Sequence, residues 1–345
     1  MVRGFLGLGV AWLVVVLVGG QRERAFRGPG FAGVTLATVV VQHVGAVVAS
    51  ANDYEDFLLL IPSAPFRGPR RSSLRRHLLT SPQLKYFRGQ YRFILDAEPA
   101  EALADARKEN RTHGDIWVSD SPPGLFLAHR LRHTIRLAVE SGIPFKFLVI
   151  SDDDVFWCIR HLARFWKVLG QPWRLAGWPH CEAGFWLDQH ALIMGRGIAE
   201  DIVARYDQLM CCPYGDIALR HWQLTSPHVY DYLPSHTAFY HEWVHRTPVN
   251  TSMPDVCNDY VAIHYVHTDE YMAELAQNAA ESAKRPFDMT RARARWTNDC
   301  PAPVQDISVS QYEQILKSRS HLHQLFPCNA NERWGLTDAA YTGGL

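Results

Sequence analysis

The sequence predicts an α/β protein in which a mostly parallel sheet is covered by helices. Solid apolar runs that alternate with helical patterns are typical of strands buried on both faces of a parallel sheet. The runs that we interpret as strands are DFLLLIP at 56–62, YRFIL at 91–95, IWV at 116–118 and FLVI at 147–150. Ligands of such sheets bind beyond the carboxyl ends of the strands. The residues that follow each run are therefore the first candidates for a site.

Two helices with an apolar stripe are interleaved with these strands. The first follows Ser121-Pro122-Pro123, where serine suits the cap and proline the first turn, and it ends before Gly142. Its stripe consists of Leu127, Ala128, Leu131, Ile135, Ala138 and Val139. The second helix runs from about Phe156 to Leu169 and ends at Gly170.

The composition is that of a globular protein without a nucleic-acid partner. Of the 345 residues, 47% are apolar and 20% are charged, and 35 basic residues balance 35 acidic ones, so no basic surface is expected. We predict three segments. Residues 1–51 form a cytosolic tail, a signal anchor and a short stem, residues 52–270 form the main α/β core, and residues 271–345 form a C-terminal decoration packed on that core.

The amino-terminal segment places the rest of the chain in the secretory lumen. Two apolar stretches, Phe5–Gly20 and Phe31–Ala51, flank an arginine-containing patch. Either stretch serves as an uncleaved anchor, or the first is a cleaved signal peptide. The sequons at Asn110 and Asn250, and seven scattered cysteines without a C-x-x-C pair, are compatible with a lumen. Cys158 is expected to be a packed thiol.

Three consecutive carboxylates, Asp152, Asp153 and Asp154, follow the apolar run at 147–150. In extended backbone the first and third point to one side and the second to the other. Two carboxylates on one side suit a hard cation such as Mn²⁺ or Mg²⁺. The alternative is a solvated acidic turn that caps the following helix, because Asp is favoured at helix amino termini.

Blocks between 56 and 267 resemble glycosyltransferase family 31, the β-1,3-galactosyl- and N-acetylglucosaminyltransferases of the Golgi. The most specific block is Ile150–Phe156 (ISDDDVF), which is similar to the family's K-x-D-D-D-[VA]-F signature. Weaker similarities, to the blocks R-R-x-x-[IL]-R, E-x5-G-D-I, E-D-V and [VI]-H, lie at 70–75, 109–116, 215–217 and 262–264. The end of the first strand (IPSAP) and the segment RRSSLRR resemble the trypanosomatid members.

The resemblance implies a GT-A fold and a set of site residues. It implies that Asp152, Asp154 and His264 hold Mn²⁺ or Mg²⁺ on the diphosphate of a UDP-sugar, and that Asp216 is the general base. The donor contacts that it implies are Arg71, Arg75, Asp115, Arg130 and Asp153.

The residues themselves leave several of these roles open. Asp216 precedes a helical pattern and is equally a helix cap. His264 is equally a packed strand residue, and His267 is an equal candidate for a ligand. The basic segment Arg67–Arg76 is either a diphosphate contact or a solvated surface run. The chain departs from the family at Gly215, where the family has Glu, and at Gln189 and His190, where the family has small residues.

The predicted function is an inverting, metal-dependent hexosyltransferase of the Golgi membrane, single-pass and type II. It moves galactose or GlcNAc from a UDP-sugar to a hydroxyl of a glycan on a glycoprotein or glycolipid, and the resemblance implies a β-1,3 linkage. Candidates for an acceptor platform are Trp178, Trp186 and Trp222. The alternative is a catalytically inactive glycan-binding relative. A metal-dependent phosphohydrolase needs a second cluster of carboxylate and histidine, which the sequence does not display.

Overall fold

The structure is a computed structural model that describes residues 56–97, 100–119, 127–181, 186–235, 237–241, 256–284, 290, 307–319 and 323–329. The predicted tail, anchor and stem at 1–51 and the sequon at Asn250 lie outside these ranges. All described residues belong to one compact unit, 49–345. Within them, no helix combines the length and the apolar character needed to cross a membrane.

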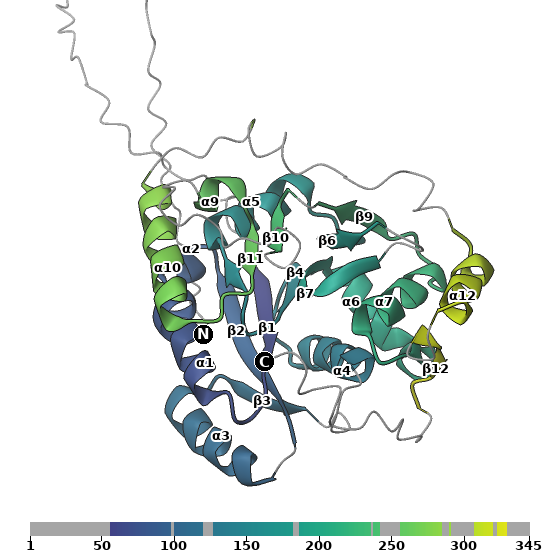
Figure 1. Ribbon diagram of the computed structural model, residues 1–345, viewed down its shortest axis with the longest axis horizontal. Coiled ribbons are helices and arrows are strands. Elements are labelled where there is room, and N and C mark those ends of the chain that lie inside the picture. Colours follow the sequence, from purple (N-terminus) through teal and green to yellow (C-terminus); the bar gives the residue numbers. More distant parts are fainter. Residues whose placement is uncertain are drawn as a thin grey trace, which may run out of the picture. The chain divides into compact units, whose positions relative to one another are not determined.

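A seven-stranded sheet forms the centre of this unit, in the order β3-β2-β1-β4-β7-β6-β9 (Figure 1). Its strands are β1 (Phe57–Pro62), β2 (Gly89–Asp96), β3 (Ile116–Ser119), β4 (Phe147–Ser151), β6 (Arg174–His180), β7 (Trp186–Gly195) and β9 (Asp231–Pro234). Neighbouring strands are parallel except at β7, which runs antiparallel to β4 and to β6. The predicted α/β class with a mostly parallel sheet is confirmed.

Helices cover both faces of the sheet, because successive residues of each strand point to opposite sides. On one face Leu59 of β1 packs in a core with α1 (Gly68–Leu74), α2 (Pro82–Tyr86), α5 (Ile159–Leu169) and α10 (Asp269–Ala283). On the other face Leu58 packs in a core with α4 (Leu127–Glu140), α6 (Arg196–Ala204), α7 (Gly215–Leu224) and α12 (Val309–Lys317). The remaining helical segments are a π-helical turn η1 (Arg75–Leu79), α3 (Ala100–His113), a 3-10 turn η2 (Tyr206–Gln208) and α9 (Val256–Asp259).

A second sheet corrects the predicted helix at 156–169. Phe156 and Trp157 form strand β5, which pairs antiparallel with β11 (Ala262–His264), and β11 pairs parallel with β10 (Phe239–His241). Helix α5 therefore begins only at Ile159. The expectation of a packed thiol at Cys158 is also wrong, because Cys158 forms a disulfide with Cys257. Pairing with residues about a hundred positions away decides both features.

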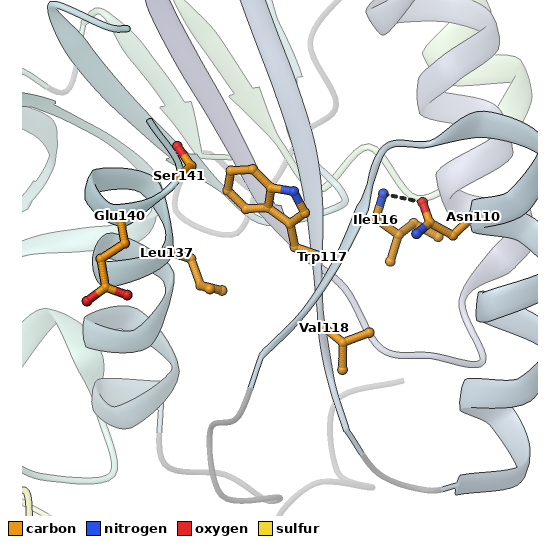
Figure 2. A pocket seen from close by; sticks show the side chains of 7 residues that line it. All are labelled: Asn110, Ile116, Trp117, Val118, Leu137, Glu140 and Ser141. Atoms are coloured by element: carbon orange, nitrogen blue, oxygen red, sulfur yellow. Dashed lines mark hydrogen bonds between the residues drawn. The ribbon is translucent and has the colours of Figure 1, made fainter. Parts of the chain in front are cut away.

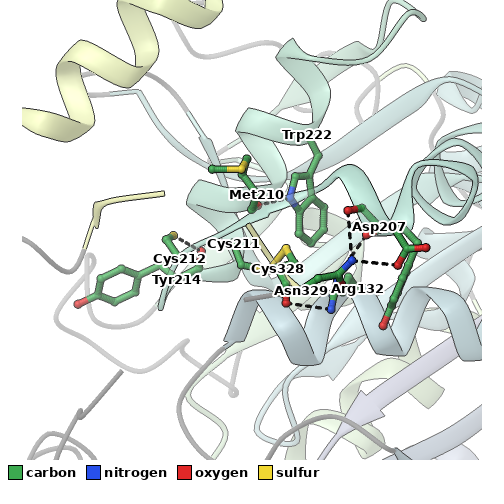
Figure 3. Close-up of a disulfide and its surroundings, with 10 residues drawn as sticks. Arg132, Asp207, Met210, Cys211, Cys212, Tyr214, Trp222, Cys328 and Asn329 are labelled. Atoms are coloured by element: carbon green, nitrogen blue, oxygen red, sulfur yellow. Dashed lines mark hydrogen bonds between the residues drawn. A yellow bond between two sulfur atoms is a disulfide. The ribbon is translucent and has the colours of Figure 1, made fainter. Parts of the chain in front are cut away.

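A second disulfide joins the middle of the chain to its carboxyl-terminal part (Figure 3). Cys211, in β8 (Met210–Cys211), bonds to Cys328, which follows β12 (Phe326–Pro327). Arg132 of α4 donates hydrogen bonds from Nη2 to the carbonyl of Cys328 and from Nη1 to Asn329 Oδ1, both at 3.2 Å. The indole of Trp222 in α7 donates to the carbonyl of Met210. These contacts join α4, α7, β8 and the residues after β12.

The described part of the carboxyl-terminal segment contributes to the core. Met272 and Leu275 of α10 belong to one apolar core, and Tyr312 and Leu316 of α12 belong to the other. The boundary that we placed at residue 270 falls inside α10, which begins at Asp269.

Candidate functional site

The acidic run leaves the carboxyl end of β4 and is fixed there by three other segments. The amide of Asp152 donates to the carbonyl of His190 in β7 at 2.9 Å. The carbonyl of Asp154 accepts from the amide of Val266, just after β11, at 2.9 Å. Asp153 turns the other way and accepts hydrogen bonds from Ser63 Oγ at 2.7 Å and from Arg67 Nη1 at 2.8 Å. The run thus lies where β1, β4, β7 and β11 come together.

Asp152, Asp154 and His264 form one group of potential metal ligands. One ligand atom from each lies within 4.8 Å of the others, and His264 Nε2 is 3.3 Å from Asp154 Oδ1. Asp154 Oδ1 is buried and receives no well-directed hydrogen bond from any residue that the structure describes. A buried carboxylate oxygen without such a donor is costly unless a cation neutralises it. The residues present therefore fit a divalent ion held by oxygen and imidazole ligands.

The two carboxyl groups of this group have divergent pKa values. Burial, and then the charge of Asp154, raise the pKa of Asp152 to about 7. Burial also acts to raise the pKa of Asp154, but contact with His264 and the charges of His267 and Arg70 outweigh it and lower that pKa to about 2. Like charges held this close in a buried place create a demand for positive charge.

Both histidines that the sequence left open as ligands lie beside Asp154. His264 ends β11, and His267 Nδ1 is 3.6 Å from Asp154 Oδ2. Between them Tyr265 has φ +67°, a left-handed conformation that a bulky residue rarely adopts. Backbone strain of this kind persists only where the surroundings enforce it, and it is concentrated at functional sites. The side chain of His267 is 56% exposed, whereas that of His264 is 10% exposed. Of the two, His264 is therefore the buried candidate for a metal ligand.

The structure also brings together Asp188, His190 and His241, which sequence reasoning missed as site residues. Asp188 Oδ1 is 2.8 Å from His190 Nδ1, and Asp188 Oδ2 is 3.9 Å from His241 Nε2. Asp188 and His190 lie in β7 where its pairing register with β6 shifts, between Gly177 and Pro179 of β6. Such irregularities re-aim side chains next to sites. The spacing Asp-x-His at 188–190 was a signal that we recorded only as a departure from the family.

Asp216 lies in the first turn of α7. Its Oδ1 accepts from the amide of Ile217 at 2.8 Å, and the residue in the cap position is Tyr214, so Asp216 is not the cap. Burial, and then the charge of Asp188, raise the pKa of Asp216 to about 7. Because Asp188 also raises the pKa of Asp152, Asp188 is within electrostatic range of both groups. A carboxylate with this pKa is suited to accept a proton near neutral pH.

Arg71 is buried, and its guanidinium is used within the protein. Its Nε and Nη2 donate to the carboxylate of Glu109, at 3.0 and 2.6 Å. Its Nη1 donates to Ser63 Oγ and to the carbonyl of Ala64, and its Nη2 also donates to the carbonyl of Pro65. All five donors of an arginine are thereby engaged. The geometry gives Arg71 the task of holding the turn after β1, with no donor left for a phosphate.

Arg75 and Asp115 form a second buried pair beside it. Nε and Nη2 of Arg75 donate to the two carboxylate oxygens of Asp115, each at 2.8 Å, and Nη1 donates to Glu109 at 2.6 Å. The hydroxyl of Tyr91 also donates to Asp115. Burial opposes ionisation, but the hydrogen bonds from Arg75 hold the pKa of Asp115 below its usual value. The predicted donor contacts Arg75 and Asp115 thus face one another.

Arg130 also lies at the carboxyl edge of the sheet, the edge at which Arg71 contacts the turn after β1. Its Nε and Nη2 donate to the two carboxylate oxygens of Asp96, the last residue of β2, at 3.2 and 2.5 Å. The pair therefore lies on the sheet edge that also carries the acidic run, two strands away.

The predicted tryptophan platform is wrong. Trp222 is fully buried, and Trp178 and Trp186 are 3% and 7% exposed, so none presents an open face to a glycan. Trp178 packs against His241 and Trp186 against His180, with ring centroids 5.4 and 5.6 Å apart. All three are therefore packing residues behind the site.

An open cavity of about 550 Å³ lies at a different place, the β3 edge of the sheet (Figure 2). Its lining comes from α3, β3 and α4 and includes Trp117, Val118 and Leu137. Asn110, the residue of one sequon, also lines it and accepts a hydrogen bond from the amide of Ile116. No residue of the acidic group contributes to this cavity.

No protein-family model matches the chain, and no curated protein matches it. Among solved structures, the chain is similar to the mannosyltransferase PcManGT from Pyrobaculum calidifontis in complex with GDP-Man and Mn²⁺, at 12% identity and TM-score 0.39, over 77% of this chain and 75% of that one. It is also similar to a glycosyltransferase involved in the glycosylation of the major capsid of PBCV-1, at 10% identity and TM-score 0.39, over 64% and 98%. With scores and identities this low, these likenesses carry no conclusion about family or activity.

Proposed function

We propose that the protein is an inverting, metal-dependent glycosyltransferase with a GT-A-like fold. The observation that carries this proposal is the group of Asp152, Asp154 and His264 at the carboxyl end of β4, with a second buried carboxyl, Asp216, in electrostatic range of Asp188 beside it. A site of this composition separates two tasks that glycosyl transfer requires. One group neutralises a leaving diphosphate, and another accepts a proton.

The residues that would hold Mn²⁺ or Mg²⁺ are Asp152, Asp154 and His264. A divalent ion there would neutralise the negative charge that develops on the diphosphate of a departing UDP. The unsatisfied Asp154 Oδ1 and the raised pKa of Asp152 both support this assignment. Asp153 instead pairs with Arg67, whose side chain is 39% exposed.

Asp216 is the proposed base. Its carboxylate accepts the proton of an acceptor hydroxyl while that oxygen forms a bond to the anomeric carbon of the donor sugar. The bond from that carbon to the diphosphate breaks in the same step, and the electron pair leaves with UDP. Attack from the face opposite the diphosphate inverts the configuration.

The finer assignments extend this proposal. We propose a UDP-sugar donor carrying galactose or GlcNAc, a glycan acceptor on a glycoprotein or glycolipid, and a β-1,3 linkage. We also propose a type II protein of the Golgi membrane, anchored through residues 1–51, with the described unit in the lumen. The disulfides Cys158–Cys257 and Cys211–Cys328 support an oxidising compartment.

A catalytically inactive glycan-binding relative is the second candidate. Gln189 favours it, because its side chain fills the space beside Gly215, where an open sugar site needs room.

The test is release of UDP from UDP-galactose and UDP-GlcNAc, measured with Mn²⁺ or with chelator and with a panel of glycan acceptors. We expect Mn²⁺-dependent turnover that Asp154→Asn and Asp216→Asn abolish. Binding of a UDP-sugar, seen as a raised melting temperature, without turnover would establish the inactive relative. If the protein shows no binding and no turnover with any nucleotide-sugar, both candidate functions are overturned.

A further inference from the structure

Three histidine rings from three strands meet beside the acidic run. His190 belongs to β7, His241 ends β10 and His264 ends β11, and one ligand atom from each lies within 4.8 Å of the others. The rings of His190 and His264 are stacked, with centroids 4.0 Å apart and planes 8° apart, and His241 lies edge-on at 4.7 Å from each of them. Because the lone pair of an imidazole lies in its ring plane, one of the two stacked rings must turn about χ2 for both to bind one ion. His241 and His264 are register partners in the parallel pair β10–β11. The sheet therefore holds the three imidazoles together.

Two of these rings carry buried nitrogens without a hydrogen-bond partner. His190 is 2% exposed and His264 is 8% exposed. His190 Nε2 and His264 Nδ1 have no hydrogen-bond partner among the residues that the structure describes. Leaving a buried polar atom unpaired costs about 1–3 kcal/mol. Two such nitrogens in one cluster indicate a ligand that takes up their lone pairs.

Asp188 orients this cluster. Its Oδ1 lies 2.8 Å from His190 Nδ1, although this contact lacks hydrogen-bond geometry. A proton on Nδ1 would face this carboxylate and leave the lone pair of Nε2 to the cluster. A carboxylate behind the imidazole is the usual second partner of a metal-binding histidine, because it fixes the tautomer and raises the basicity of the ligating nitrogen. The other oxygen, Oδ2, lies 3.9 Å from His241 Nε2, so the same carboxylate adds negative charge beside a second ring.

We propose that His190, His241 and His264 bind a divalent transition-metal ion of the Zn²⁺ class, separate from the hard cation of Asp152 and Asp154. Imidazole nitrogen suits Zn²⁺, Cu²⁺ and Ni²⁺, whereas Mn²⁺ and Mg²⁺ prefer oxygen ligands. Three imidazoles leave a fourth position of a tetrahedral ion open to water. Together with Asp188, these histidines form a second cluster of carboxylate and histidine beside Asp152 and Asp154, which the sequence alone did not display.

The two groups share His264, which gives the proposal a consequence for the proposed transferase. His264 faces Asp154 through Nε2, whereas its unpaired nitrogen is Nδ1. Because a neutral imidazole has a single lone pair, His264 ligates only one of the two ions at a time. If the proposed function holds, Zn²⁺ in the histidine cluster weakens Mn²⁺ binding at Asp152 and Asp154, and Zn²⁺ acts as an inhibitor.

Zinc binding itself is the test, and it does not depend on transferase activity. The metal-stripped full chain is titrated with Zn²⁺ against a chromophoric chelator, and Co²⁺ is used as a spectroscopic probe of tetrahedral nitrogen ligation. We expect the parent protein to bind one Zn²⁺ tightly per chain. The Asp188→Asn variant should bind Zn²⁺ about 10- to 100-fold more weakly than the parent. His241→Ala should lower affinity by more than Asp188→Asn does, because it removes a ligand.

Matched variants decide where the ion lies. Asp152→Asn combined with Asp154→Asn should keep the tight Zn²⁺, and His228→Ala, at an exposed histidine before β9, should have no effect. His241→Gln, of similar volume, replaces His241→Ala if the latter lowers the melting temperature. Absence of tight Zn²⁺, unchanged affinity in the His241 variant, or loss of Zn²⁺ in the double aspartate variant would each overturn the proposal.

Discussion

The side chain of Gln189 occupies the space that a side chain at position 215 would need. A Cβ built on Gly215 overlaps with Gln189 Oε1 and comes within 3.1 Å of the carbonyl of Leu127. Two of the three positions at which the chain departs from the family it resembles, Gly215 and Gln189, are therefore in direct contact. They are one coupled change between β7 and the first residue of α7, the helix that carries Asp216.

Gly215→Ala should destabilise the protein by about 1–3 kcal/mol, because it overpacks this contact. Shortening the opposing residue, in Gly215→Ala with Gln189→Ala, should restore most of that loss. Unfolding in urea measures both, and a double-mutant cycle gives the coupling between the two sites. Additive effects of the two changes would contradict direct contact.

Asp152→Asn should stabilise the cation-free protein, and increasingly so as the pH rises. The folded-state pKa of Asp152, about 7, is above the usual aspartate value of 3.8, so the folded state binds the proton more tightly and loses stability as the pH rises between these values. The variant lacks this loss. The measurement is the difference in unfolding free energy between variant and parent from pH 4 to pH 7 in chelator, where each pKa unit corresponds to about 1.4 kcal/mol.

The difference between variant and parent is needed because buried histidines titrate in the opposite sense. The pKa values of His129 and His161 are lowered to about 4, chiefly by burial, so folding becomes more favourable as the pH rises toward their usual value. Asp105→Asn, at an exposed residue of α3, is the control. Saturating Mn²⁺ should reverse the order and leave the parent the more stable protein.

Transfer should require the ionised form of Asp216, so kcat/KM should rise with pH through about 7. Asp216→Asn should lower kcat about 10²- to 10⁴-fold, which is the usual contribution of a general base. Asp188→Asn removes a negative charge that raises the pKa of Asp216, so it should move the acidic limb of the pH profile to lower pH. If the acidic limb of the pH profile does not shift in Asp188→Asn, Asp188 does not influence the pKa of Asp216.

Arg71→Gln should destabilise the fold by about 3–5 kcal/mol, because it removes the buried guanidinium that pairs with Glu109. Among the described residues, Glu109 then keeps only its hydrogen bond from Arg75. Arg76→Gln is the matched control, since Arg76 is 60% exposed and its pair with Asp269 should contribute no more than about 1 kcal/mol. Urea unfolding measures both. If Arg71 instead bound the donor, its variant would raise KM for the donor at nearly unchanged stability.

Local pattern was sufficient for the strands and for one feature of the site. The apolar run at 147–150 became β4, Phe147–Ser151, and Asp153 faces away from Asp152 and Asp154 as expected. The backbone at Asp153 and Asp154 is a turn, however, and not the extended strand on which that expectation rested. These features depend on neighbours along the chain, which a sequence displays directly.

Long-range pairing determines what the sequence did not display. His241 reaches His264 only because β10 and β11 pair, and His190 reaches both because β7 runs antiparallel and its register shifts. Phe156 belongs to a strand rather than a helix for the same reason, since its partner is Ile263. Arg71 meets Glu109 across 38 positions. No periodicity within a single segment reports such contacts.

The two described disulfides bear on the order in which the molecule is made. They join cysteines 99 and 117 positions apart, and each has one partner close to the site, Cys158 after the acidic run and Cys211 before α7. The second bond cannot form until Cys328 has left the ribosome. Strand β8, which precedes the helix that carries Asp216, is thus cross-linked only after α12 and β12 have been synthesised, and a chain interrupted before residue 328 retains an unpaired Cys211.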